Sequence, residues 1–187
     1  NTGTACFILA LESGAVHERT VIEGNQADED CGIFFSDSTA GTEIHGDFFF
    51  NNNRHFGGSR FVSLKGGVDV IIRDNYTDRS GAPDSSREIL FFSSPVTRLL
   101  VKGNTFANFD DSGGTGRVLT GSTTNTPNVF FYDNYFGTGY YALWMRDQTY
   151  TNYIIRDNQF FSTNKINGTI GGNVTVSGIG SQANNVG

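Results

Sequence analysis

Four acidic residues are the strongest candidates for chemistry in this chain of 187 residues. Asp84 and Glu88 lie in one polar stretch, and Asp110 and Asp111 lie in a similar stretch further along. Hydrolysis of a glycosidic bond needs two carboxyl groups about 5 to 9.5 Å apart, one to protonate the leaving oxygen and one to act as nucleophile or base. The four residues are therefore the predicted catalytic set. Acidic residues in loops are also ordinary solvated turn formers, so this interpretation stays open as well.

A second group combines arginines with aromatic residues. Arg60 and Arg117 can each bind a sugar carboxylate through two hydrogen bonds. Tyr140, Tyr141 and Trp144 offer aromatic faces for sugar binding. These five are the predicted substrate-binding residues. Trp144 falls within an apolar segment, so core packing is an equally good interpretation of it.

No motif for a metal ion or cofactor accompanies these residues. The chain contains no phosphate loop, zinc pattern or EF-hand. The three histidines, His17, His45 and His55, have no ligand spacing and are predicted to lie on the surface. We therefore expect no metal and no cofactor.

Charge and composition exclude several classes of partner. The net charge of −6 opposes binding to nucleic acid or to an anionic membrane, since both need a concentrated basic face. No apolar run approaches the roughly 18 residues of a membrane span. The 24 glycines, 17 phenylalanines and three prolines are typical of short strands and tight turns in one domain.

An internal repeat must position the candidate residues. The segment VIIRDNY (70–76) has five relatives, and the six aligned asparagines lie at intervals of 28, 22, 29, 30 and 24 residues: Asn25, Asn53, Asn75, Asn104, Asn134 and Asn158. Repeats of this length indicate a solenoid. Asn carries a donor and an acceptor and tolerates left-handed backbone, so we expect the six side chains to form a ladder at a turn.

A second apolar segment precedes each asparagine at matching intervals, with starts at Cys6, Cys31, Phe61, Ile89, Val118 and Ala142. Each repeat is therefore predicted to form one coil of two strands, with a loop of variable length after the Asn. Six coils stacked at about 4.8 Å give an all-β parallel solenoid of roughly 30 Å. Cys6 and Cys31 are expected to lie one above the other.

The alternation around each Asn predicts which side chains face the core. Residues three and five positions before the Asn, such as Ile72 and Val70, point inward. Residues four positions before it then point outward, yet all six are apolar: Val21, Phe49, Ile71, Leu100, Phe130 and Ile154. A contiguous apolar row of this length indicates a surface that is covered by another copy of the chain, by a neighbouring domain or by long loops.

The residues just before four of the first segments form a predicted row of alternating charge: Asp30, Arg60, Glu88 and Arg117. An ion-pair ladder that sets the strand register is one interpretation, although exposed pairs contribute only about 0 to 1 kcal/mol each. A groove in which the two arginines bind sugar carboxylates is the second interpretation.

The pattern Val-x-Ile-x-x-Asn-x-Phe, seen in variants at 99–106, 129–136 and 153–160, resembles the right-handed parallel β-helix of the pectate-lyase-like superfamily. The resemblance covers about residues 5 to 165. It implies action on acidic or complex polysaccharides, because the superfamily includes lyases, polygalacturonases, epimerases and trimeric bacteriophage tailspikes. No lyase or galacturonase signature occurs at a matching position, so no catalytic residue is transferred.

The outward apolar row favours the tailspike branch, in which three columns pack side by side. We expect a β-helix over 1–164 and a terminal coil or subunit-exchanging tail over 165–187. The expected function is recognition of bacterial surface polysaccharide, with or without its cleavage, by a homotrimer outside the cell or on a virion. Two competing hypotheses are a monomeric secreted lyase, hydrolase or epimerase, and a structural shaft or adhesin segment.

Overall fold

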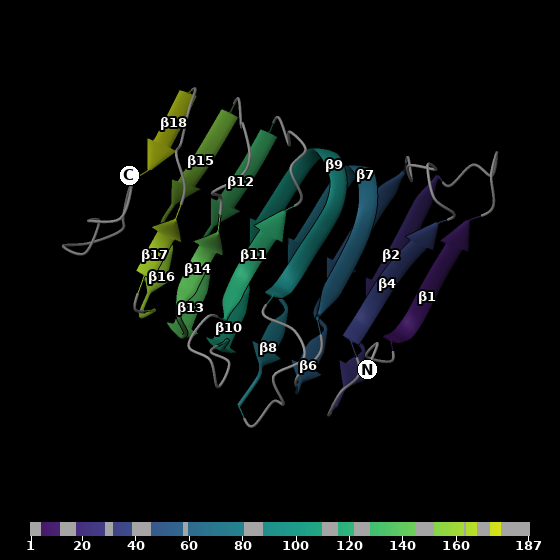
Figure 1. Cartoon of the computed structure of the whole chain (residues 1–187), viewed down its shortest axis with the longest axis horizontal. Coiled ribbons are helices and arrows are strands. Elements are labelled where there is room, and N and C mark those ends of the chain that lie inside the picture. Colours follow the sequence, from purple (N-terminus) through teal and green to yellow (C-terminus); the bar gives the residue numbers. More distant parts are fainter. Residues whose placement is uncertain are drawn as a thin grey trace.

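The computed structural model describes residues 5–11, 18–28, 32–38, 46–57, 60–80, 88–109, 116–121, 128–144, 152–162, 164–167 and 173–176. Within these ranges the chain is all β, without a helix, and its strands pair in parallel to form a solenoid (Figure 1). The predicted fold class is confirmed at this level. None of the described segments is a helix long and apolar enough to cross a membrane.

The first strands of the coils form one half of a large, 12-stranded sheet. Their order is β1 (Ala5–Leu11), β4 (Gly32–Ser38), β7 (Val62–Arg73), β9 (Glu88–Lys102), β11 (Arg117–Gly121), β14 (Tyr141–Trp144) and β17 (Asn164–Asn167). Figure 1 shows these strands side by side along the long axis of the molecule.

The second strands form the other half of the same sheet, because β7 and β9 are long enough to run through both halves. The remaining second strands are β2 (Arg19–Glu23), β5 (Asp47–Asn51), β12 (Asn128–Tyr132), β15 (Asn152–Arg156) and β18 (Asn173–Val176). β17 and β18 extend the sheet by pairing with β14 and β15. The predicted domain boundary at residue 164 stays a prediction.

A third strand follows each Asn, where the sequence predicted only a loop. These strands are two to four residues long and make a small, six-stranded sheet: β3 (Gln26–Ala27), β6 (Arg54–Phe56), β8 (Tyr76–Asp78), β10 (Thr105–Asn108), β13 (Tyr135–Thr138) and β16 (Gln159–Phe160). The prediction of two strands per repeat was therefore wrong. The short third strands satisfy their backbone by pairing between coils.

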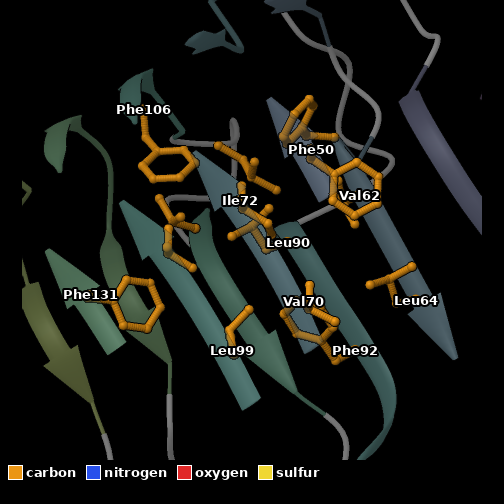
Figure 2. Packing of buried hydrophobic residues seen from close by; sticks show 14 of the residues in the cluster. Phe50, Val62, Leu64, Val70, Ile72, Leu90, Phe92, Leu99, Phe106 and Phe131 are labelled. Atoms are coloured by element: carbon orange, nitrogen blue, oxygen red, sulfur yellow. The ribbon is translucent and has the colours of Figure 1, made fainter. Parts of the chain in front are cut away.

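The core contains the inward-facing rows that the alternation predicts. Val70 and Ile72 are fully buried, and Phe48, Phe50, Leu99, Val101, Val129, Phe131 and Ile155 are buried in register with them. Figure 2 labels five of these second-strand residues, Phe50, Val70, Ile72, Leu99 and Phe131. They share one core with Val62, Leu64, Leu90 and Phe92 from the first strands and Phe106 from the small sheet. Each such side chain stabilises the fold by roughly 1.5–3 kcal/mol on burial.

The predicted asparagine ladder is confirmed. Asn75 Nδ2 donates to Asn104 Oδ1 at 2.9 Å, and the same bond repeats between every pair of neighbouring coils from Asn25 to Asn158, at 2.8 to 3.0 Å. The amides also bond to backbone, as in Asn75 Nδ2 to Phe50 O at 2.8 Å. The ladder thus pairs buried backbone groups that the turn would otherwise leave unsatisfied.

The left-handed residue of each turn lies one position before the ladder Asn. Six residues at this place have positive φ: Gly24, Asn52, Asp74, Gly103, Asp133 and Asp157, with φ between 50° and 70°. Gly, Asn and Asp are the residue types that adopt this conformation at the lowest cost. The left-handed conformation that we expected of the ladder residues belongs to their neighbours.

One predicted alignment is shifted by two residues. Phe34 pairs with Val62, whereas stacking of Cys31 on Phe61 requires Phe34 beside Leu64. Cys6 likewise lies beside residue 33, so the predicted stacking of Cys6 on Cys31 is wrong. Asp30 and Cys31 lie outside the described residues, so the place of Asp30 in the charged row stays a prediction.

Candidate functional site

The candidate row on the large sheet is built at the beginning of consecutive first strands. Glu88 is the first residue of β9 and pairs in register with Arg117, the first residue of β11. Arg117 pairs in turn with Tyr141 at the start of β14. Arg60 precedes β7, and its guanidinium reaches Glu88. The structure thus brings Arg60, Glu88 and Arg117 into one row, as the sequence predicts, and Tyr141 extends that row.

Arg60 and Glu88 form a partly buried ion pair. Arg60 Nη2 lies 3.1 Å and Nε 3.3 Å from the same carboxylate oxygen, Glu88 Oε2. The side chains are 32% and 13% exposed, which leaves the pair accessible from one side. The Arg60 guanidinium also stacks 4.0 Å from the centre of the Phe91 ring. These contacts fix the register between coils, and they hold a carboxylate in a defined position.

The other members of the predicted sites are only partly described. Asp84, Asp110 and Asp111 lie outside the described residues, so the catalytic set stays a prediction. Tyr140 and Tyr141 are half-buried and meet edge to face, with ring centres 4.5 Å apart. Trp144 ends β14, and its side chain lies outside the described part.

A second candidate site, which the sequence analysis missed, lies on the outer face of the small sheet. Arg54, Phe56 and Tyr76 line a cavity of about 270 Å³. Arg54 pairs in register with Tyr76, and Phe56 pairs with Asp78. The rings of Phe56 and Tyr76 lie 5.5 Å apart at an angle of 44°. Two tilted rings and a guanidinium therefore share one depression between β6 and β8.

Asp78 anchors this cavity through several hydrogen bonds. Its Oδ1 accepts from Asn108 Nδ2 at 2.9 Å and from the Ser80 backbone at 2.8 Å, and its Oδ2 accepts from the Tyr76 hydroxyl at 3.3 Å. Partial burial raises the pKa of Asp78, but these donors outweigh it and hold that pKa below its usual value. The carboxylate therefore stays ionised, and its hydrogen bond to Asn108 joins β8 to β10.

Tyr76 is held in its protonated form by the same surroundings. Burial, followed by the negative charge of Asp78 and the hydrogen bond to it, raises the pKa of Tyr76, while Arg54 acts in the opposite direction. The hydroxyl is thus a fixed donor to Asp78, and the ring keeps one orientation beside Phe56. The site is preorganised without a ligand.

The prediction that His55 lies on the surface is wrong, because His55 belongs to the inner face of the small sheet. His55 is fully buried within β6 and lies 5.9 Å from the Phe61 ring centre, whereas the sequence predicted a surface position. Alternation explains this, because Arg54 and Phe56 point outward and the residue between them must point inward. His17 and His45 lie outside the described residues.

The sequence around the cavity contains only a weak indication of the third strands that form it. The three residues after two neighbouring ladder asparagines read RHF and YTD, in which polar or aromatic outward positions flank an inward one. Three residues are too few to establish a period of two. The described residues contain no cluster of acidic, His and Cys side chains suited to a metal ion.

Comparison of the chain with protein-family models, with curated proteins and with solved structures gives no match.

Proposed function

We propose that the chain is a trimeric β-solenoid module of the bacteriophage tailspike type, which recognises bacterial surface polysaccharide outside the cell or on a virion. The observation that carries this proposal is the apolar row on the outer face of the second strands. Val21, Phe49 and Ile71 are aligned in register, and Leu100, Phe130 and Ile154 continue the row.

The row is covered only in part by its own chain. Val21 is 47% exposed, and the other five side chains are half-buried. Arg19 lies 4.7 Å over the Phe49 ring, and Tyr132 stacks 6.2 Å from Phe130. When three parallel copies pack around a threefold axis, the same row of each copy can face that axis and be buried there. Packing of three copies along this row is the arrangement that we propose.

Regular spacing of polar and aromatic groups supports recognition of a polymer. The row of Arg60, Glu88, Arg117 and Tyr141 repeats at the strand spacing of about 4.8 Å. A polysaccharide also presents repeating groups along a line, so consecutive sugars meet equivalent positions on consecutive coils. We propose that Arg60, Arg117, Tyr140, Tyr141 and Trp144 contribute to this binding surface.

Cleavage is an extension of the same proposal. Glu88 would act with Asp84, Asp110 or Asp111, which follow the neighbouring third strands. The Arg60 contact leaves Glu88 Oε1 without a hydrogen bond to any described residue. The ion pair equally suits a non-catalytic shaft, which is the second candidate function.

We further propose that the solenoid has six coils and winds with a right hand. The six strands of the small sheet and the six ladder asparagines support the number of coils. The right-handed sense is favoured because nearly all connections between parallel strands of one sheet have this hand. These features are those of the pectate-lyase-like β-helix that the sequence resembles.

The proposal is tested by incubating the chain with a panel of bacterial capsular and O-antigen polysaccharides. Binding is measured by calorimetry, and cleavage by release of reducing ends and by absorbance of unsaturated uronates. Saturable binding to at least one polysaccharide supports the proposal, and products identify a hydrolase or a lyase. Absence of binding across the panel would favour the shaft.

A further inference from the structure

We propose that the outer face of the small sheet is a binding site for an acidic oligosaccharide, in which the carboxylate of one sugar pairs with Arg54 and its ring packs on Phe56 and Tyr76. This inference rests on the proposed function and adds the class of sugar and a second surface. It concerns a different face of the solenoid from the row that contains Arg60 and Glu88.

The cavity has a shape and lining suited to a single sugar ring. Its volume of about 270 Å³ lies over two aromatic rings that are already packed against each other. Aromatic rings bury apolar surface at little cost in conformational entropy, and the C–H face of a pyranose is the apolar part of a sugar. Because the Tyr76 hydroxyl is bonded to Asp78, its ring does not need to reorient when a ligand binds.

Arg54 supplies the selectivity for an acidic sugar. Its side chain is exposed at the rim, and within the described part of the chain it forms no ion pair or hydrogen bond through its guanidinium. Asp78, which pairs in register with Phe56, is already bonded to Asn108, Ser80 and Tyr76. A guanidinium beside aromatic rings pairs well with a carboxylate through two hydrogen bonds.

A second aromatic platform lies further along the same face. Tyr76, Thr105 and Tyr135 are paired in register across β8, β10 and β13. Tyr135 is therefore two strand spacings, about 9.6 Å, from Tyr76. Its ring packs 5.2 Å from that of Phe161, and the two side chains are 38% and 64% exposed. Two platforms on one line suit a chain of linked sugars.

The outward column of the small sheet differs in character from the apolar row of the large sheet. Its first members after each ladder Asn can hydrogen-bond or stack, and none is aliphatic: Gln26, Arg54, Tyr76, Thr105, Tyr135 and Gln159. Such a surface is stable in water without a protein cover. We therefore assign this face to ligand binding and the apolar row to packing between copies.

The test is an NMR titration of the full chain with single sugars, which removes any dependence on linkage. The acidic probes are the methyl glycosides of glucuronate, galacturonate and N-acetylneuraminate, and methyl glucoside is the neutral probe. We expect an acidic probe to shift the ring resonances of Phe56 and Tyr76. The Arg54→Gln variant should bind the acidic probe with a Kd roughly tenfold higher or more, because a charge-assisted hydrogen bond is lost.

Arg156→Gln is the matched control, since Arg156 is an exposed arginine that lies 4.7 Å over Tyr132 on the other sheet. This variant should bind as the wild type does. Phe56→Leu provides a second test that leaves the charge intact and should weaken binding by loss of stacking.

Three results would overturn the inference: no shift at Phe56 or Tyr76 with any acidic probe, equal binding of the neutral probe, or unchanged affinity in Arg54→Gln. If polysaccharides from the panel still bind while these results hold, only the inference about the small sheet fails. If neither sugars nor polysaccharides bind, both the inference about the small sheet and the proposed function fail.

Discussion

Each turn of the solenoid depends on two adjacent residues with different tasks. The first adopts a left-handed backbone, and only Gly, Asn and Asp are found there among the six turns. The second is the ladder Asn, whose amide bonds to the next coil and to backbone carbonyls. The pair GN, NN or DN is therefore the unit that the repeat preserves.

Asp133, which has φ of 53°, allows the first task to be tested alone. Its side chain is exposed, so substitution changes mainly the cost of the left-handed backbone. Asp133→Ala should lower the free energy of unfolding by about 1 kcal/mol, because a Cβ without a polar group disfavours this conformation. Asp133→Gly should lie within about 0.5 kcal/mol of the wild type. Urea denaturation measures both, and equal stability of the two variants would contradict the role given to this position.

Asn75 tests the second task. Its amide makes bonds to Asn104, to Phe50 and to Asn53, all of them buried. Asn75→Ala should cost roughly 2–4 kcal/mol, since several backbone and side-chain groups lose their partners.

Asn128→Ala is the control for Asn75→Ala, because Asn128 also bonds to an Asn in the next coil, Asn152, at 2.8 Å, but on the exposed surface. The control should cost less than about 1 kcal/mol. If guanidinium denaturation gave similar losses of unfolding free energy for Asn75→Ala and Asn128→Ala, burial of the ladder would not contribute to stability.

At the scale of strands, the ion pair between Arg60 and Glu88 joins β7 to β9. A double-mutant cycle with Arg60→Gln and Glu88→Gln should give a coupling energy of roughly 0.2–1 kcal/mol, because the pair is only partly buried. If the chain cleaves a polysaccharide, Glu88→Gln should abolish cleavage while costing little stability. Full cleavage by this variant would remove Glu88 from the catalytic set.

The hydrogen bond from Asn108 on β10 to the Asp78 carboxylate on β8 should make the stability of the fold depend on pH. The pKa of Asp78 in the folded chain lies below its usual value. Its contribution is therefore fully present above the unfolded pKa of about 3.9 and is lost as the pH falls through the lower folded value. Wild type should lose more stability than Asp78→Asn on acidification below about pH 3.9. Parallel curves for the two proteins in urea denaturation at a series of pH values would contradict this.

The strands differ in how far the sequence predicts them. The second strands were predicted in register because each ends at an Asn, and Val70 and Ile72 face inward as expected. The alignment failed in β4, where Phe34 pairs with Val62 and the backbone amides of Ile33 and Phe34 both bond to Phe61 O. Periodicity in the sequence does not reveal such an irregularity.

The third strands, and with them the cavity at Arg54, were missed for a different reason. A run such as RHF is too short to show alternation, and its identity as a strand depends on pairing with the neighbouring coils. Tertiary context also placed His55 in the core. The row of Arg60, Glu88 and Arg117 was predicted because a longer apolar segment follows each of these residues, whereas Tyr141 was not assigned to it.

At the scale of the molecule, the two outer faces have opposite character. The second strands present an apolar row, and the small sheet presents side chains that can hydrogen-bond or stack. We propose that the first face is buried between copies of the chain while the second remains open. Single charges placed on the two faces should therefore have different effects on assembly.

Light scattering of the purified chain, coupled to size exclusion, measures how many copies of the chain pack together. Wild type should have three times the chain mass of 20.4 kDa. Phe130→Asp should dissociate to a single chain, because it places a charge in the apolar row, whereas Tyr135→Asp on the small sheet should remain a trimer. A monomeric wild type, or a Phe130→Asp variant that stays trimeric, would contradict the account.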